Sequence, residues 1–134
     1  MILYLAAAWS RKDEARAIAE RIERECPRVT VNSRWLGEEQ AAYYPPDKVG
    51  RALMDLEDVD ACNVLARLSD GLEKRKRVPA GLASGARMYE QGYASARQKR
   101  VVVIGGPQHV FDFLAGVVHV PNVDQLISWL KVYS

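Results

Sequence analysis

The sequence of 134 residues lacks the features that define several protein classes. Its only two cysteines, Cys26 and Cys62, form no CxxC pair, and its only two histidines, His109 and His119, have no metal-ligand spacing. This pattern predicts neither a disulfide framework nor a metal centre, so we expect no metal and no cofactor.

Long apolar runs and an excess of one charge are also missing. The longest apolar run, residues 2–9, is far shorter than the ~20 residues that a membrane-spanning helix needs. That run also lacks the charged start and cleavage site of a signal peptide. The net charge of +2 is too small to indicate nucleic-acid binding. We therefore expect a cytoplasmic protein that does not contact membranes.

The composition is that of one globular domain. The hydrophobic fraction of 49% and the charged fraction of 27% are ordinary, and 134 residues can bury a sizeable core. No repeat and no low-complexity linker divides the chain. We therefore expect a single domain that spans residues 1–134.

Strand-like and helix-like patterns alternate along this domain. Nearly continuous apolar runs indicate buried strands, and apolar residues at helical spacing, as after Ser10, indicate helices. Such alternation predicts an α/β fold with a parallel five-stranded sheet flanked by helices, in the Rossmann-like or flavodoxin-like style. The expected strands are residues 1–9, 29–35, 63–68, 101–106 and 117–120. The expected helices are residues 11–25, 49–61, 84–98 and 123–133.

Ligands of such sheets bind beyond the carboxyl ends of the strands, where the stretch SGARMYEQGYA (residues 84–94) begins. Ser84 would cap a helix and Gly85 would expose its backbone, so that free N–H groups and the helix dipole could receive an anion. Glu90, the only acid of this stretch, lies about 9 Å further along the helix axis. One helix could therefore hold a phosphate and also direct a carboxylate into the same cleft.

A simpler interpretation of Glu90 is a solvated helix glutamate that pairs with Arg87 or Arg97. Spacing alone favours this simpler role. Gly92, directly behind the acid, would allow a neighbouring element to approach the helix closely.

Three blocks of the sequence carry a more specific signal. They read ILYLAAAWSRKDE, ALMDLEDVDACNVL and SGARMYEQGYASARQKRVVVIGG, in this order along the chain. Together they resemble the nucleoside 2-deoxyribosyltransferase family and the related nucleoside 5′-monophosphate N-glycosidases. With VFDFL and the last helix, the resemblance covers nearly the whole chain.

The resemblance implies catalytic roles for three residues. Glu90 takes the position of the family's nucleophile. Asp55 takes that of an aspartate that acts as an acid or positions the sugar, and Tyr4 that of a tyrosine beside the glutamate. An N-glycosidic bond breaks through an oxocarbenium-like transition state, which a carboxylate below C1′ stabilises or attacks. A second carboxyl with a raised pKa can protonate the departing base.

The resemblance also implies the substrate's binding groups. Ser84 matches a serine that binds the 5′-phosphate in the monophosphate glycosidases, where transferases of free nucleosides have an aspartate. Gly85, Arg11 and Arg87 would serve the same phosphate.

Two tryptophans, Trp9 and Trp35, end predicted strands at the same edge of the sheet. They could stack on the base or simply pack in the core.

Two functions therefore stay open. The first is an enzyme that cleaves or exchanges the N-glycosidic bond of a (deoxy)nucleoside or its 5′-monophosphate, and the second is a nucleotide-binding or sensing module without turnover. A dinucleotide oxidoreductase is disfavoured because no GxGxxG follows the first strand. Apolar residues in FDFLAGVV, together with the resemblance, predict a homodimer or higher homo-oligomer.

Overall fold

A parallel five-stranded sheet organises the computed structural model, which describes residues 1–38, 47–70 and 85–134. Its strand order, β2-β1-β3-β4-β5, is the flavodoxin-like order, and every neighbouring pair is parallel. This confirms the predicted α/β fold. The strands are β1 (Ile2–Ala6), β2 (Thr30–Val31), β3 (Val64–Leu68), β4 (Arg100–Ile104) and β5 (Val117–Val120).

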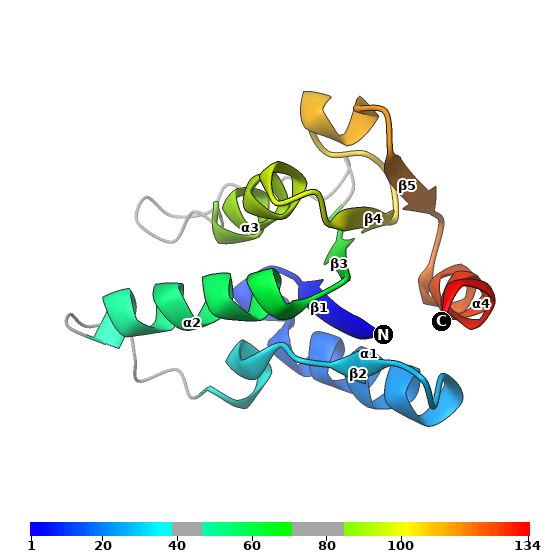
Figure 1. Cartoon of the computed structure of the whole chain (residues 1–134), viewed down its shortest axis with the longest axis horizontal. Coiled ribbons are helices and arrows are strands. Elements are labelled where there is room, and N and C mark those ends of the chain that lie inside the picture. Colours follow the sequence, from blue (N-terminus) through cyan, green and yellow to red (C-terminus); the bar gives the residue numbers. More distant parts are fainter. Residues whose placement is uncertain (39–46, 71–84) are drawn as a thin grey trace.

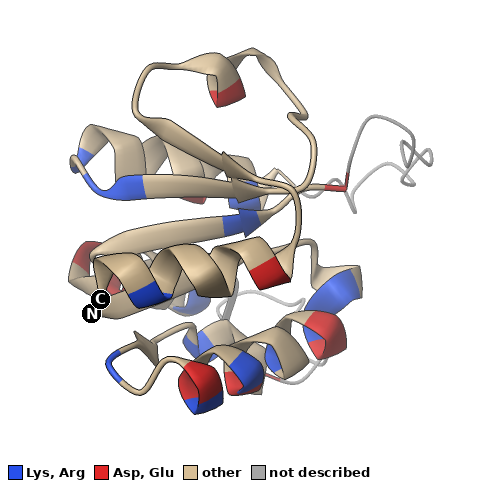
Figure 2. Cartoon of the chain, turned by 90° about the vertical axis from the view of Figure 1, so that its right-hand side faces the viewer, with Lys and Arg blue, Asp and Glu red and all other residues tan. Residues whose placement is uncertain are grey.

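Helices cover both faces of the sheet (Figure 1). Helices α1 (Lys12–Glu25) and α4 (Val123–Tyr133) lie on one face, and α2 (Asp47–Ala61) and α3 (Ala86–Ala96) lie on the other. Figure 2 shows that charges of both signs lie mainly on the helices, whereas most of the strand surface is uncharged. Within the described ranges, no helix is long and apolar enough to cross a membrane.

The register of the strands decides which side chains face α2 and α3. Tyr4 pairs with Leu65 and Ala6 pairs with Arg67 across β1 and β3. Because strand side chains alternate between faces, these four side chains share one face. It is the face of α3, since Arg67 contacts Gln91 of that helix.

The first strand is shorter than predicted. β1 ends at Ala6, the last residue paired with β3, and Trp9 begins the 3₁₀ helix η1 (Trp9–Arg11). Ser10 lies inside η1 and does not occupy the N-cap position of α1. Arg11 holds that position and makes no capping hydrogen bond through its side chain.

The second strand, predicted over residues 29–35, contains only Thr30 and Val31. Side chains replace the missing ladder bonds: Ser33 Oγ accepts from the Leu5 amide at 2.7 Å, and the Trp35 indole N–H donates to the Leu5 carbonyl at 2.9 Å. Trp35 itself lies in the 3₁₀ helix η2 (Arg34–Gly37). The backbone amide and carbonyl of Leu5 thus have hydrogen-bond partners although β2 does not extend this far.

Helix α3 begins at Ala86, with Gly85 as its N-cap, and it ends before Gln98, which has a φ of 57°. Ser84 lies outside the described residues. The expected close approach at Gly92 is wrong, because a Cβ at this exposed position would meet no described atom within 4 Å. The VFDFLA turn contains the 3₁₀ helix η5 (Val110–Phe113).

Candidate active site

The three predicted catalytic residues come together between the sheet and its α2–α3 layer. Tyr4 lies in β1, Asp55 in α2 and Glu90 in α3. Tyr4 is 0% exposed and Glu90 9% exposed. The charges of both Asp55 and Glu90 act on the Tyr4 hydroxyl, so the three groups occupy one region of the protein.

Glu90 is a buried acid rather than a solvated one. Its pKa is raised to about 8, mainly by burial and then by the negative charge of Asp55, while a contact with Tyr4 opposes the rise in part. The simpler interpretation is wrong. Arg87 pairs with Asp70 and Arg97 pairs with Asp60, and in the described ranges no cation forms an ion pair with Glu90.

Asp55 also has an unfavourable environment for its own charge. Its pKa is raised to about 7, mainly by burial and then by the carboxylates of Glu38 and Asp58. Arg34 and Arg51 oppose it only in part. Oδ1 of Asp55 is buried without a hydrogen-bond partner among the described residues. A buried acceptor left unpaired costs about 1–3 kcal/mol, so a donor from a ligand would be well placed here.

The Tyr4 hydroxyl is a second unsatisfied polar group in this region. Burial, followed by the charges of Glu90 and Asp55, raises the pKa of its phenol well above the ordinary value. The phenol is therefore neutral. Its hydroxyl lies close enough to Glu90 to favour the ionised carboxylate, yet it completes no hydrogen bond of normal geometry with any described residue.

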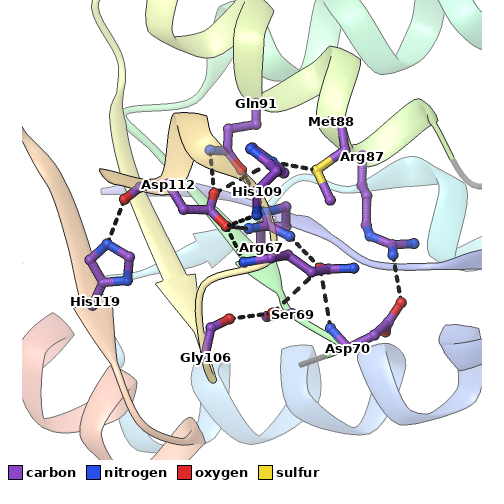
Figure 3. Close-up of polar contacts among 11 residues, drawn as sticks. Arg67, Ser69, Asp70, Arg87, Met88, Gln91, Gly106, His109, Asp112 and His119 are labelled. Carbon is purple, nitrogen blue, oxygen red and sulfur yellow. Dashed lines mark hydrogen bonds and ion pairs between the residues drawn. The ribbon is translucent and has the colours of Figure 1, made fainter. Parts of the chain in front are cut away.

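Arg87 lies at the start of α3 and is only 5% exposed. Its Nη2 donates to Oδ2 of Asp70 (Figure 3). Nε and Nη1 are buried and have no hydrogen-bond partner in the described part of the chain. The first amides of any helix also lack acceptors within that helix. The N-terminal end of α3 thus carries a guanidinium, that of Arg87, with unused hydrogen-bond donors.

Arg11 reaches the same carboxylate from the other side. Its Nη1 donates to Asp70 Oδ1 at 3.0 Å and to the Ser69 carbonyl at 3.1 Å. Its Nε and Nη2 bind the two carboxylate oxygens of Glu14 at 2.8 and 2.7 Å. The structure therefore brings the two arginines predicted from the sequence, Arg11 and Arg87, to one aspartate that the sequence did not indicate.

The two predicted tryptophans differ in environment. Trp35 is 6% exposed and its indole N–H is bound to Leu5, which favours the core-packing alternative. Trp9 is half-buried and packs on Trp35 with ring centroids 6.1 Å apart, while Lys12 lies 4.6 Å from the Trp9 ring. Trp9 is therefore less buried than Trp35.

A buried polar network beside this site escaped sequence reasoning. Arg67 of β3 and Asp112 of η5, both 0% exposed, pair at 2.6 Å. Arg67 also donates to Gln91 and, at 2.7 Å, to Gln108 (Figure 3). Gln91 donates to Asp112 at 3.0 Å. Since Gln91 follows Glu90 directly in α3, the network fixes the turn of helix that carries the acid.

Asp112 remains ionised at the centre of the network. Burial alone would raise the pKa of its carboxyl. Hydrogen bonds from the Gln108 amide, the Gln91 side chain and Arg67 outweigh burial and lower the pKa to about 2. The sequence signals were an arginine inside the strand NVLARL and an acid inside VFDFLA, but no local spacing connects the two.

The histidines belong to the surroundings of this network. His119 Nε2 lies 2.6 Å from the Asp112 carbonyl, and His109 Nε2 contacts the sulfur of Met88. In the described ranges, no group of three or more His, Cys, Asp or Glu residues could hold a metal ion.

A separate hollow of about 440 Å³ lies beside the carboxyl ends of β4 and β5. None of the predicted site residues lines it, and its lining has no pair of titratable groups. The lining consists of Gly105, Pro107, Phe113, His119, Val120 and Pro121.

The sheet order and the two helical layers define a doubly wound α/β protein of the flavodoxin-like style. A solved structure that shares this fold is that of the Clostridium botulinum CMP N-glycosidase, BcmB. It superimposes with a TM-score of 0.60 at 16% sequence identity, over 99% of this chain and 100% of that chain. No protein-family model and no curated protein matches the chain.

Proposed function

We propose that this protein cleaves the N-glycosidic bond of a nucleoside 5′-monophosphate, with Glu90 as nucleophile and Asp55 as acid. The observation that carries the proposal is the carboxyl pair of buried Glu90 and partly buried Asp55, whose pKa values are raised to about 8 and about 7. Paired carboxyls with raised pKa values are typical of glycoside hydrolysis. The fold shared with a CMP N-glycosidase supports the same chemistry.

In the proposed reaction, a carboxylate oxygen of Glu90 attacks C1′ of the sugar. The C1′–N bond breaks, the base takes its electron pair, and Asp55 supplies a proton to the base. Water then hydrolyses the glycosyl ester and returns Glu90 to its starting form, with Asp55 taking a proton from that water. A second base in place of water would give exchange instead of hydrolysis.

The pair holds the one proton that this reaction needs near neutral pH. The pKa values of Glu90 and Asp55 are both raised, to about 8 and about 7, so the two carboxyls can share one proton. Positive charge that develops at C1′ favours the ionised form of Glu90, which lies below it. Substrate thereby shifts the proton towards Asp55, where the base needs it.

Tyr4 and Arg87 would position the two ends of the substrate. The neutral phenol of Tyr4 favours the ionised form of Glu90. Arg87, with its unused donors, and the adjacent end of α3 would hold the phosphate, as would Arg11 and Ser84. One charge-assisted hydrogen bond is worth about 1.5–3 kcal/mol, roughly a ten- to hundredfold preference for monophosphates over nucleosides.

A substrate panel tests the proposal. Ribo- and deoxyribonucleosides and their 5′-monophosphates are each incubated with the protein, with and without a second free base, and the products are separated by chromatography. We expect release of the base from at least one monophosphate, with free nucleosides processed more slowly. Binding of monophosphates without release from any of them would instead identify a nucleotide-binding or sensing module.

We also propose that the protein forms a homodimer or higher homo-oligomer. Four large apolar side chains on and beside η5 are exposed, as the sequence suggested. Light scattering after gel filtration should give a multiple of the chain mass, and a monomer at micromolar concentration would contradict the proposal. The side chains are those of Val110, Phe111, Phe113 and Leu114.

A further inference from the structure

Asp70 lies between Arg11 of η1 and Arg87 at the N-terminal end of α3. These are the two arginines that would face a phosphate. Its Oδ1 accepts from Arg11 and its Oδ2 accepts from Arg87 (Figure 3). The Asp70 side chain is 23% exposed, whereas that of Arg87 is 5% exposed. The partly accessible carboxylate therefore neutralises a guanidinium that is almost completely buried.

The hydrogen bond between Asp70 and Arg87 involves Nη2, the nitrogen that belongs to both anion-binding edges of the guanidinium. A guanidinium binds an anion with two parallel hydrogen bonds along either its Nε–Nη2 edge or its Nη1–Nη2 edge. Both edges include Nη2, which carries one N–H for each edge, and Asp70 accepts one of these two. Nε and Nη1 are the two donors left over, and neither has a partner in the described part of the chain.

While Asp70 stays in place, a phosphate cannot use the edge of Arg87 whose Nη2–H Asp70 accepts, and at the other edge it would lie beside a carboxylate. It would compete for Nη2 and would also meet the negative charge of the aspartate. Arg11 offers an alternative position for this carboxylate, because its Nη1 already binds Oδ1 of Asp70 at 3.0 Å. The carboxylate can leave Arg87 and remain paired.

We propose that Asp70 is a displaceable counter-ion that occupies the phosphate position of Arg87 in the empty site and sets the affinity for phosphorylated ligands. This role rests on the proposed function, which places the substrate's phosphate at Arg87. Without ligand, Asp70 spares the protein the cost of an unpaired buried cation. With ligand, the phosphate takes over Nη2 and Asp70 remains on Arg11. Asp70 is thus a specificity-determining residue for the 5′ group.

Calorimetric titration with inorganic phosphate and with ribose 5-phosphate tests the role without any glycosidic bond. The substitution Asp70→Asn keeps a hydrogen-bond acceptor for Arg87 but removes the competing charge. We expect both phosphates to bind about tenfold more tightly, the effect of roughly one charge interaction near a protein surface. Ribose, which has no phosphate, should gain nothing.

Three further variants make the result specific. Asp124→Asn removes the same charge from an exposed acid that pairs with Arg21 and should leave phosphate affinity unchanged. In the double variant Asp70→Asn/Arg87→Gln the gain should disappear. Asp70→Ser provides a second removal of the carboxylate, and thermal unfolding of each protein verifies folding.

Unchanged or weaker phosphate binding by folded Asp70→Asn and Asp70→Ser would overturn the proposal and leave Asp70 as a holder of Arg87. A gain for ribose as well would also overturn it. Neither result affects the proposed glycosidase, because that function is judged by release of base. Conversely, a protein without turnover could still show the tenfold gain in phosphate affinity.

Discussion

Glu90 of α3 and Asp55 of α2 share one buried region, where the negative charge of Asp55 raises the pKa of Glu90. Structural acids are normally paired when buried, because an isolated buried charge is costly. In the described part of the chain, Glu90 has no ion-pair partner. The protein therefore carries two destabilising carboxyls, an arrangement that stability alone does not favour but that acid–base chemistry requires.

Replacing Glu90 by glutamine should stabilise the protein in a pH-dependent way. The pKa of Glu90 is about 8 in the folded protein against an ordinary 4.5, so the folded state binds more protons between these values. Wild-type stability therefore falls as pH rises from about 4.5 to about 8, whereas glutamine does not titrate. Urea unfolding at pH 5 and pH 8 should show the advantage of Glu90→Gln growing by a few kcal/mol. The exposed Glu20→Gln serves as control, and a pH-independent difference for Glu90→Gln would contradict the burial of its charge.

Replacing Asp55 by asparagine should slow the reaction and change its pH profile. The wild type should show a bell-shaped kcat/KM with limbs near the two pKa values, about 7 and about 8. Below the bell both carboxyls are protonated, and above it neither is. An amide cannot donate an acidic proton, so Asp55→Asn should lose about 10²–10⁴ in kcat and one limb of the bell. An unchanged profile would exclude Asp55 as the acid.

Removing Asp112 should destabilise the protein far more than breaking a more exposed ion pair. Asp112→Ala leaves the fully buried guanidinium of Arg67 without its charge partner, at a cost of about 3–5 kcal/mol. Arg97→Ala breaks the more exposed pair with Asp60, which is worth only about 0–1 kcal/mol. Denaturant unfolding of both variants measures the difference. Equal losses would mean that the network is not a buried ion pair in solution.

Gly92→Ala should stabilise helix α3. Gly92 lies inside the helix, and no described atom lies within 4 Å of the added Cβ. Alanine then improves helix propensity by roughly 0.5–1 kcal/mol. Gly105→Ala is the opposing control, because Gly105 has a φ of +99°, which strains any side chain there. A loss of stability for Gly92→Ala would show that another element packs on this glycine.

The sequence predicted those parts of the molecule that depend on local pattern. Apolar runs identified three of the strands closely, and helical spacing after Ser10 predicted α1. The short second strand could not be predicted, because Ser33 and Trp35 replace its ladder bonds through side chains that contact Leu5. The pattern of apolar and polar residues over 29–35 is nevertheless typical of a strand.

The candidate site was only partly accessible to sequence reasoning. Glu90 and Asp55 stood out through the family resemblance, and the structure brings them together through the packing of α2 on α3. Asp70 and the pair of Arg67 with Asp112 form contacts between residues 17 or more positions apart. No periodicity encodes such a distant pairing, so only the folded chain reveals it.

Turnover by Glu90→Ala is the measurement that tests the central claim most directly. Base release from the best monophosphate of the panel is compared between wild type, Glu90→Ala and the exposed-site control Glu20→Ala, after calorimetry has shown that each protein still binds that monophosphate. Removing a nucleophile should lower the rate of base release by several orders of magnitude, whereas Glu20→Ala should match the wild type. A folded Glu90→Ala protein that keeps a tenth of the wild-type rate would contradict the assignment of Glu90 as nucleophile.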